Sequence, residues 1–579
     1  MPSCDDCDVM FENVHDLQNH VKRWCPEHQP PKRELAEEDD TTANHNIPVF
    51  QDFINVFDGD IGVGLMAVIM SFNILWYIIT ILGWIQYYLI CSFAAELPWS
   101  SCGNWWNTEQ CRERTFYKTD TSINTSLSIS NVSIHNYTTL NSTVSTEFTS
   151  AAEEFWIYNV LRKSEGLEDM GSMQWHLVLS NFIGWIIVGA CLIKGVQSLG
   201  KVVYVTATAP YVLLTIILIR GLTLDGSING IIWYLTPDFE KLASPQVWLE
   251  AAVQVFYSLG PAYGGVITMA SHNKFHQKSS VDTMICVIAD GLTAFYAGIV
   301  VFAIIGYMAE ESGSTVEEVA KASGLGLAFV AYPEAVSQMP LPQLWAVLFF
   351  AMMLSTLLDS AFGVVETVTH ALADLFPMLA KYPILTLVAC CSFWFVISLP
   401  FSMQGGIYLF QLADWYTCSF ALLAIAFMES VVIGWMYGAD RFSCDIQIMT
   451  NRPVGWLLRI LWCLVIPFVL IIAFFVSLAM YKTPNYGDDY VYQPYAIAIG
   501  MFLALSPFIP AVLLAFYEIY KATGTLKARI VFLLNPASTW QPIDPTAREI
   551  YRIRPYIYEK TLTKRIRTNL LGNKKTPCL

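Results

Sequence analysis

The chain has 579 residues, of which 55% are hydrophobic and 14% charged, and its formal net charge is -15. So large an apolar share excludes an ordinary soluble domain and is typical of a membrane protein with several spans. The negative charge argues against nucleic-acid binding by the chain as a whole. Because no acid, base and nucleophile occur together at a recognisable spacing, we do not expect an enzyme.

The first segment, residues 1–46, is polar and lacks the apolar core of a signal peptide. Its potential metal ligands have the spacing C-x2-C-x12-H-x4-C, and they are Cys4, Cys7, His20 and Cys25. This spacing is typical of a zinc finger with cysteine as the fourth ligand, and Phe11 and Leu17 supply a small core. We therefore predict a cytosolic zinc-binding segment, with a disordered tail as the alternative. One finger reads about three base pairs, so nucleic acid is not an expected partner.

Ten or so segments after this head are long and apolar enough to cross a hydrocarbon core of about 30 Å. Their approximate ranges are 61–90, 175–193, 202–220, 248–270, 282–308, 341–373, 383–402, 405–437, 456–480 and 494–519. No alternating barrel pattern appears, so we predict an all-α polytopic membrane protein. Lysine and arginine in alternate loops place both termini in the cytosol. The transmembrane domain would then cover residues 47–520, followed by a basic cytosolic tail at 521–579.

The long loop 97–173 is expected on the extracellular side. It holds four glycosylation sequons, at Asn124, Asn131, Asn136 and Asn141. Cys102 and Cys111 lie at its start, on the oxidising side, and we predict a disulfide between them. These features indicate a glycoprotein of the plasma membrane.

The segment from Trp248 to Met269 has membrane length but contains the helix-breaking run Ser258-Leu-Gly-Pro-Ala-Tyr-Gly-Gly265. Proline removes a backbone donor and the glycines favour non-helical backbone, so several polar groups lose their helical partners. Inside a membrane such groups must be satisfied by neighbouring protein, water, or a bound ion or substrate. The run therefore predicts a binding site, with a structural kink as the alternative.

Further motifs extend over residues 50–545. They include Leu97-Pro98-Trp99, Gly171-Ser-Met-Gln-Trp175, Gly200-Lys201-Val-Val-Tyr204, Tyr332-Pro333-Glu334-Ala335, Leu358-Asp359-Ser360 and Gln404-Gly-Gly-Ile-Tyr408. Together with the interrupted segment, this set resembles the sodium- and chloride-dependent neurotransmitter symporter family. Phe410-Gln-Leu412 and Gly264-Gly265 most resemble its glycine and neutral amino acid branch.

The resemblance implies a fold of two inverted five-helix repeats with broken helices at the membrane midplane. It implies sodium-coupled symport, by alternating access, of glycine or another small neutral amino acid or neurotransmitter. Family members have twelve spans, and this chain starts at what resembles the third, so the implied fold is incomplete. The alternative is a membrane protein that does not transport and instead modulates or scaffolds partners, such as full-length relatives.

The resemblance also assigns roles to individual residues. The implied substrate contacts are Tyr257, Ser258, Gly260, Tyr263, Ile74 and Ala361. The implied sodium ligands are Ser258, Asp290, Thr356, Asp359 and Ser360, and the implied chloride ligands are Gln254 and Ser258. The implied gate residues are Asp374 and Asp414. An acid beside hydroxyl groups suits a hard cation, which requires oxygen ligands.

Four positions depart from the family pattern. Asp290 stands where the family usually has asparagine, and Ala294 where a chloride-binding serine is expected. A fixed carboxylate there would supply the charge that chloride otherwise provides, so we predict sodium binding that is largely independent of chloride, with degeneration of the site as the alternative. Ile78 replaces a substrate-contacting tyrosine, and His272 replaces the tyrosine of a Ser-Tyr-Asn-Lys gate sequence.

Overall fold

The computed structural model falls into two units, Met1–Ile47 and Pro48–Leu579, which are described separately. The residues that it describes are 3–4, 9–10, 62–113, 149–320, 325–417, 420–487, 490–533, 542, 544–553 and 562–572. In the first unit, β1 (Ser3–Cys4) pairs antiparallel with β2 (Val9–Met10). Of the predicted zinc ligands, Cys4 lies in this pair, whereas Cys7, His20 and Cys25 lie outside the described residues.

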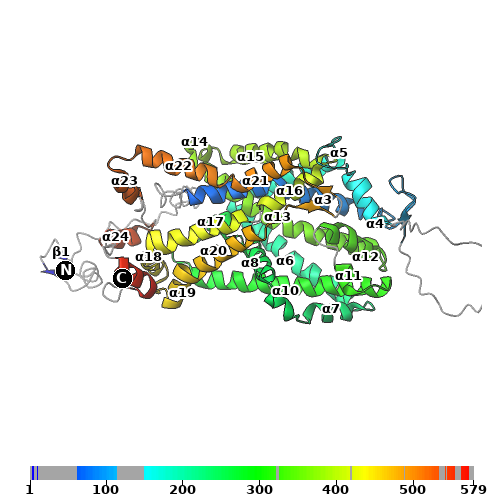
Figure 1. The fold of residues 1–579 in the computed structure, drawn as a ribbon, viewed down its shortest axis with the longest axis horizontal. Coiled ribbons are helices and arrows are strands. Elements are labelled where there is room, and N and C mark those ends of the chain that lie inside the picture. Colours follow the sequence, from blue (N-terminus) through cyan, green and yellow to red (C-terminus); the bar gives the residue numbers. More distant parts are fainter. Residues whose placement is uncertain are drawn as a thin grey trace, which may run out of the picture. The chain divides into compact units, whose positions relative to one another are not determined.

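Helices account for most of the second unit (Figure 1). Its longer helices are α3 (Val63–Cys91), α5 (Trp175–Leu192), α6 (Val196–Gly221), α8 (Pro245–Leu259), α10 (Ser279–Ser312), α13 (Pro342–Leu375), α15 (Pro383–Ser398), α16 (Gly406–Thr417), α17 (Phe420–Val431), α18 (Ala439–Thr450), α20 (Ile466–Ala479), α21 (Pro494–Leu505) and α22 (Phe508–Lys521).

Shorter helices and turns connect them. These are α4 (Ala151–Glu154), η2 (Phe155–Leu161), α7 (Ser227–Leu235), η3 (Glu240–Ala243), η4 (Pro261–Tyr263), α9 (Gly265–Ser271), α11 (Val316–Ala320), η5 (Leu327–Ala331), α12 (Tyr332–Ser337), α14 (Pro377–Ala380), η6 (Leu399–Ser402), η7 (Val432–Gly438), α19 (Trp456–Ile460), η8 (Leu461–Val465), α23 (Leu526–Leu533), α24 (Pro545–Ile553) and α25 (Leu562–Leu571). Two small strand pairs complete the unit: β3 (Cys111–Arg112) with β4 (Thr149–Ser150), parallel, and β5 (Asn485–Tyr486) with β6 (Tyr490–Val491), antiparallel.

The predicted all-α polytopic class is confirmed. Within the described residues, 8 helices are long and apolar enough to cross a membrane, or up to 9 if α21 and α22 form one span. This is fewer than the ten or so segments expected from the sequence, since the segment 248–270 divides into α8, η4 and α9. The segment 494–519 is also not one straight helix, because α21 and α22 meet at an angle of 49°. Pro507, which lacks a backbone N–H, lies at this bend.

Helix α3 is the most enclosed of the long helices. It packs against α5 and α13, and also against α15, α16, α17 and α22. Apolar residues occur all round α3, which is the pattern expected of a helix buried on every side. Its few polar residues can therefore act on several neighbours at once.

Two polar residues of α3 satisfy backbone carbonyls at the two helix interruptions. The hydroxyl of Ser71 donates a 2.5 Å hydrogen bond to the carbonyl oxygen of Tyr263. The Nδ2 atom of Asn73 donates to the carbonyl oxygen of Leu503 at 3.3 Å and to the hydroxyl of Ser506 at 2.8 Å. Polar backbone exposed by a break in a membrane helix must find such partners inside the protein. Helix α3 thus stabilises both interruptions.

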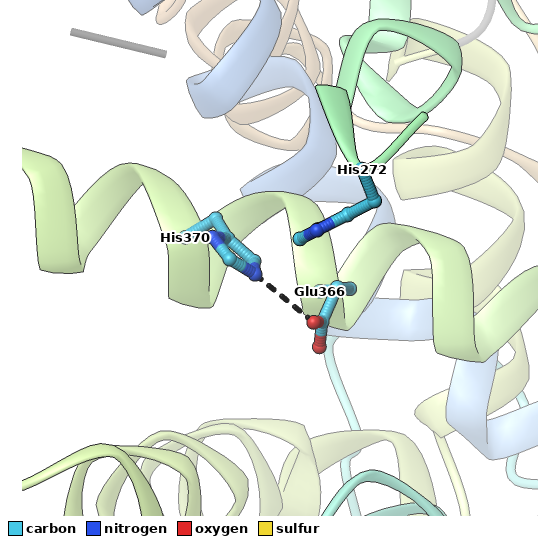
Figure 2. A group of neighbouring side chains, drawn as sticks. All are labelled: His272, Glu366 and His370. Atoms are coloured by element: carbon cyan, nitrogen blue, oxygen red, sulfur yellow. Dashed lines mark hydrogen bonds and ion pairs between the residues drawn. The ribbon is translucent and has the colours of Figure 1, made fainter. Parts of the chain in front are cut away.

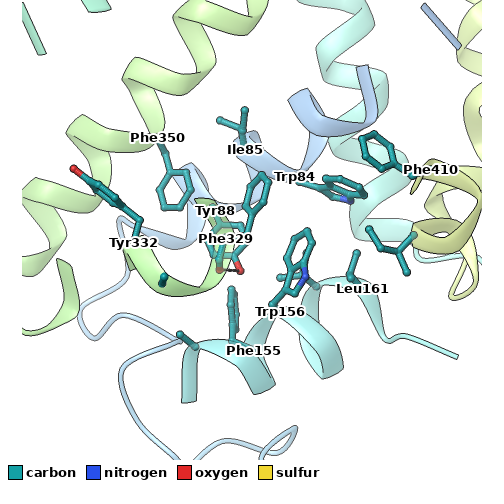
Figure 3. Packing of buried hydrophobic residues seen from close by; sticks show 14 of the residues in the cluster. Trp84, Ile85, Tyr88, Phe155, Trp156, Leu161, Phe329, Tyr332, Phe350 and Phe410 are labelled. Carbon is teal, nitrogen blue, oxygen red and sulfur yellow. Dashed lines mark hydrogen bonds between the residues drawn. The ribbon is translucent and has the colours of Figure 1, made fainter. Parts of the chain in front are cut away.

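An aromatic cluster anchors one end of α3 (Figure 3). The rings of Trp156, on η2, and Phe329, on η5, stack with their centroids 4.8 Å apart. The hydroxyl of Tyr88 donates to the carbonyl oxygen of Phe329 at 2.8 Å, so the buried tyrosine has a polar partner. Trp84 meets Trp156 edge to face at 5.3 Å. The cluster therefore joins α3 to η2, within the loop 97–173, and to η5, which precedes α12.

Candidate functional site

The predicted interruption between α8 and α9 is confirmed. Gly260 ends α8 with a left-handed φ of 60°, and its N–H donates to the carbonyl oxygen of Phe256 at 3.0 Å. Gly264 has a φ of 76° and begins α9. Residues with a side chain rarely adopt these angles, so glycine is required at both positions. The turn between them holds Tyr263, whose carbonyl oxygen bonds to Ser71.

Ser258 and Asp290 meet beside this interruption. Ser258 lies in the last turn of α8, and its Oγ atom donates a 2.5 Å hydrogen bond to Oδ1 of Asp290, on α10. The hydrogen bond gives this carboxylate a polar partner, and an unpaired charge in a membrane helix would be costly. Ser258 itself is exposed. The pair offers a hydroxyl and a carboxylate oxygen, both of which are hard donors suited to an alkali-metal ion.

The second predicted group of sodium ligands lies on α13. Asp359 accepts a hydrogen bond from the hydroxyl of Thr206, on α6. The hydroxyl of Ser360 lies 3.5 Å from the carbonyl oxygen of Thr356, one turn earlier in the helix. The acid and its neighbouring hydroxyls therefore form a cluster of oxygen donors between α6 and α13. The role of these residues in sodium binding stays a prediction.

Thr206 and Ser71 are site residues that the sequence did not reveal. Each is a small polar residue in a long apolar helix, a setting in which hydroxyl groups usually bond to their own helix. Thr206 follows this preference, because its hydroxyl also donates to the carbonyl oxygen of Val202 at 3.1 Å. The contacts of Thr206 with Asp359 and of Ser71 with Tyr263 join residues separated by 153 and 192 positions in the chain, which no local pattern signals.

The predicted substrate contacts divide into a buried and an exposed group. Ile74, Tyr263 and Ala361 belong to one cluster of buried apolar side chains, with exposed fractions of 3%, 8% and 0%. Tyr257 is 38% exposed, and its ring meets that of Tyr263 edge to face at 6.4 Å. Gln254, the predicted chloride ligand, has an exposed side chain on α8. Three of the predicted residues thus belong to one buried apolar cluster, and one of them, Tyr263, lies in the turn η4.

A cavity of about 420 Å³ lies elsewhere, near α12 and the start of the loop 97–173. Trp99, Tyr307 and the acidic residues Glu113, Glu311 and Glu334 are among the residues that line it. None of the predicted substrate, sodium or chloride ligands contributes to its wall. The cavity is thus separate from the residues around the interruption.

The two predicted gate acids, Asp374 and Asp414, lie near polar side chains. Asp414, on α16, has the hydroxyl of Tyr77, on α3, as a hydrogen-bond partner. Asp374 lies at the end of α13, one helical turn after His370.

The outer loop brings its two predicted disulfide cysteines together. The Sγ atoms of Cys102 and Cys111 lie at bonding distance, with a Cα–Cα separation of 5.8 Å. Close by, the carboxylate of Glu154 accepts hydrogen bonds from the backbone N–H of Thr108 at 2.9 Å and from the hydroxyl of Thr149 at 2.9 Å. The four predicted glycosylation sites, at Asn124, Asn131, Asn136 and Asn141, lie outside the described residues.

Comparison with known proteins decides the family. The model of the sodium:neurotransmitter symporter family matches residues 41–522. The chain belongs to this family. It is 39% identical to the sodium- and chloride-dependent taurine transporter of Canis lupus familiaris over 501 residues, or 86% of this chain and 77% of the relative. It is 40% identical to the sodium- and chloride-dependent creatine transporter 1 of Homo sapiens over 480 residues, or 82% of this chain and 73% of the relative.

A third symporter relative is the sodium- and chloride-dependent glycine transporter 2 of Xenopus laevis. The two are 38% identical over 493 residues, which is 83% of this chain and 62% of the relative. The chain is thus a multi-pass membrane transporter of this family, as the motifs indicated, and its relatives are not enzymes. Because relatives named for taurine, creatine and glycine are similarly identical, the predicted glycine branch is not singled out. The family match begins after the four predicted zinc ligands and gives zinc no support.

Proposed function

We propose that the protein is a sodium-coupled symporter of a small neutral amino acid or a similar solute. The contact between Ser258 and Asp290, at the end of the interrupted helix, is the observation that carries this proposal. It places oxygen donors from α8 and α10 beside the interruption, where backbone groups lack helical hydrogen-bond partners. An ion bound there would connect α8 to α10, and the solute would bind one turn further on, at η4.

The proposed sodium ligands are the oxygen atoms of Ser258 and Asp290 and, separately, those of Thr356, Asp359 and Ser360. Hydroxyl, carbonyl and carboxylate oxygens are the donors that hard cations prefer. The hydrogen bond from Thr206 to Asp359 supports the second group, because it orients the carboxylate and leaves further lone pairs for an ion. We propose that sodium is transported together with the solute.

The proposed driving ion is sodium without an obligatory chloride. Asp290 already brings a negative charge to Ser258, which is the residue that would otherwise contribute to a chloride site. Ala294, one turn further along α10, offers no hydroxyl to an anion. The relatives are named sodium- and chloride-dependent, so this property would set the chain apart from them.

The proposed solute is small. Ile74, Tyr263 and Ala361 are buried in one apolar cluster. Gly260 lies within contact distance of the Tyr263 ring, since a Cβ atom there would be 2.9 Å from it. Glycine is our first candidate, and taurine and creatine, for which two relatives are named, are the next. We further propose that the protein acts in the plasma membrane, with both termini in the cytosol and its exposed apolar helix surfaces in contact with lipid.

Uptake by cells that express this chain on their surface tests the proposal. Labelled glycine, taurine and creatine are offered separately, with sodium or with an equal concentration of choline outside. We expect accumulation of at least one solute that requires sodium and exceeds that of untransfected cells. Surface expression without uptake of any of the three would instead favour a non-transporting protein that modulates partners, such as full-length relatives.

A further inference from the structure

Two histidines and a glutamate converge near the end of the interrupted helix (Figure 2). They are His272, which follows α9, and Glu366 and His370, one turn apart on α13. One potential ligand atom from each residue lies within 4.8 Å of the others. None of the three belongs to the proposed sodium, chloride or substrate contacts. The Ser-Tyr-Asn-Lys sequence expected of the family has tyrosine where this chain has His272, so the cluster is not part of the pattern that identified the symporter.

The geometry within the cluster is close to that of a metal site. Nε2 of His370 lies 3.1 Å from Oε1 of Glu366. The rings of His272 and His370 meet at 68° with their centroids 4.9 Å apart. Ligand atoms around tetrahedral zinc lie roughly 3.3 Å from one another, as follows from Zn–N distances of about 2.0–2.1 Å. Small side-chain rotations would therefore bring all three atoms to one ion.

We propose that His272, Glu366 and His370 bind one divalent transition-metal ion of borderline softness, with Zn²⁺ as the best fit. Two imidazole nitrogens and a carboxylate oxygen form a common three-residue ligand set for zinc, and water completes the tetrahedron. Magnesium and calcium prefer oxygen ligands alone and would bind this set poorly. The pair at positions 366 and 370 is suitably spaced, because residues four apart share one face of a helix.

Access and burial also suit an ion. The side chain of Glu366 is 6% exposed, whereas that of His370 is 34% exposed, so an ion can enter from the His370 side and reach a buried carboxylate. Asp374, one turn further along α13, adds negative charge near His370. Lys274 and Lys278 lie in the loop between α9 and α10, which the distribution of basic residues predicts to be cytosolic.

Metal binding here would join α9 to α13. Helix α9 is a segment of only seven residues that begins at the left-handed Gly264, whereas α13 is a continuous helix of 34 residues. An ion held by both would restrict movement of α9 relative to α13. It would also stabilise the folded state by mass action, because the unfolded chain does not hold the three ligands together.

Zinc titration of the purified full-length protein tests the proposal. All samples carry Cys4→Ser and Cys7→Ser, so that the predicted ligands of the N-terminal segment do not compete. Zn²⁺ binding is followed by competition with a chromophoric chelator, and the unfolding temperature is measured with and without Zn²⁺. We expect one zinc equivalent and a raised unfolding temperature. Neither readout depends on transport, so failure here is distinguishable from failure of the proposed symport.

Three variants separate the cluster from other histidines. His272→Tyr restores the residue typical of the family, His370→Gln removes the second nitrogen, and His276→Gln is the control. His276 is exposed and bonds to the carbonyl oxygen of Met449 at 2.9 Å, outside the cluster. Loss of even an outer-shell partner weakens metal binding roughly 10- to 100-fold, so we expect at least this loss in the first two variants and none in the control.

X-ray absorption of the zinc-loaded protein provides a test that needs no histidine variant. We expect a first shell of histidine nitrogen and oxygen without sulfur. The proposal is overturned if zinc is bound through sulfur, if no zinc equivalent is bound, or if His272→Tyr and His370→Gln bind zinc as tightly as His276→Gln. Equal weakening by all three variants would also overturn it, because binding would then not be specific to the cluster.

Discussion

The hydroxyl of Ser258 donates a 2.5 Å hydrogen bond to the carboxylate of Asp290, which joins the last turn of α8 to α10. The chain ends α8 two residues later, at the left-handed Gly260. A negative charge is thereby fixed beside the interruption in the helix. In the proposed symporter this charge favours binding of a cation nearby and makes a bound anion unnecessary.

The double variant Asp290→Asn/Ala294→Ser should make transport depend on chloride. It removes the fixed charge and adds the hydroxyl that the family places on this helix, so sodium would again need an anion nearby. We expect sodium-dependent uptake to fall about tenfold when chloride is replaced by gluconate, which corresponds to about 1.4 kcal/mol. The unaltered protein should lose little of its sodium-dependent uptake under the same replacement. Equal chloride dependence of the two proteins would refute the role of Asp290.

Asp359→Asn should weaken sodium activation of uptake. Asparagine keeps an oxygen that can accept the hydrogen bond from Thr206, so the helices α6 and α13 remain joined, but the negative charge is lost. Cation sites are tuned by the number of charged ligands. We expect the half-saturating sodium concentration to rise at least about tenfold.

The matched variant for Asp359 is Thr206→Val, which removes the hydrogen bond and keeps the charge. Its effect on sodium activation should be smaller than that of Asp359→Asn, because Thr206 only orients the acid. If Thr206→Val raised the half-saturating sodium concentration more than Asp359→Asn, the contact would matter for packing, and the assignment of Asp359 to sodium would be wrong.

Asp440→Ala should strongly destabilise the protein. The guanidinium of Arg459 donates to Oδ1 of Asp440 at 2.6 Å, and the side chains are 8% and 7% exposed. Removing one partner of a buried ion pair leaves the other charge uncompensated, at a cost of about 3–5 kcal/mol. Thermal unfolding in detergent measures the loss, and the double variant Asp440→Leu/Arg459→Met should recover most of it.

The control for the buried pair is Asp238→Ala. Asp238 and Lys241 lie 3.4 Å apart but are 50% and 72% exposed. Exposed pairs contribute about 0–1 kcal/mol, so the unfolding temperature should hardly change. A similar loss of stability in both alanine variants would contradict the explanation by burial.

The outer loop should lose stability in acid through Glu154. Burial acts to raise the pKa of this carboxyl, but hydrogen bonds from Thr108, Asn107 and Thr149 outweigh it, and the pKa lies below its ordinary value. A lowered pKa in the folded state means that the contribution to stability is complete above the ordinary pKa of about 4.3 and is lost as the pH falls through the lowered value.

Glu154→Gln tests this pH dependence. Its amide N–H would face donors such as Asn107 Nδ2, which lies 3.1 Å from the carboxylate, so the variant should unfold at a lower temperature at pH 7. The difference from the unaltered protein should shrink as the pH falls below the ordinary glutamate pKa and through the lowered pKa of Glu154. The neighbouring Glu153→Gln serves as the control. A difference that stays constant with pH would rule out titration of Glu154 as the cause.

The interruption at Ser258–Gly265 could be predicted from the sequence, because proline and clustered glycines act on their own backbone. The bend between α21 and α22 was not predicted, although Ser506 and Pro507 lie there, since the residues on both sides are mostly apolar. A single proline in a membrane span often does no more than kink it. Fewer continuous spanning helices occur among the described residues than apolar segments were expected, because hydropathy measures apolar length and does not show where a helix breaks.

The site could be predicted only where family motifs named its residues. Asp290 and Asp359 were expected from the resemblance, but Thr206 and Ser71 were not, because their partners are remote in the chain. His272 was noticed as a departure from the family, yet its meeting with Glu366 and His370 depends on the packing of α9 against α13. Such contacts arise from tertiary structure and leave no local pattern in the sequence.

Transport by the purified protein in liposomes tests whether sodium alone drives uptake. The liposomes contain potassium gluconate, and labelled glycine, taurine or creatine is added outside with sodium gluconate or potassium gluconate. We expect an inward sodium gradient to drive accumulation of at least one solute in the complete absence of chloride. No sodium-driven accumulation of any of the three, from protein that is folded and correctly inserted, would contradict this expectation.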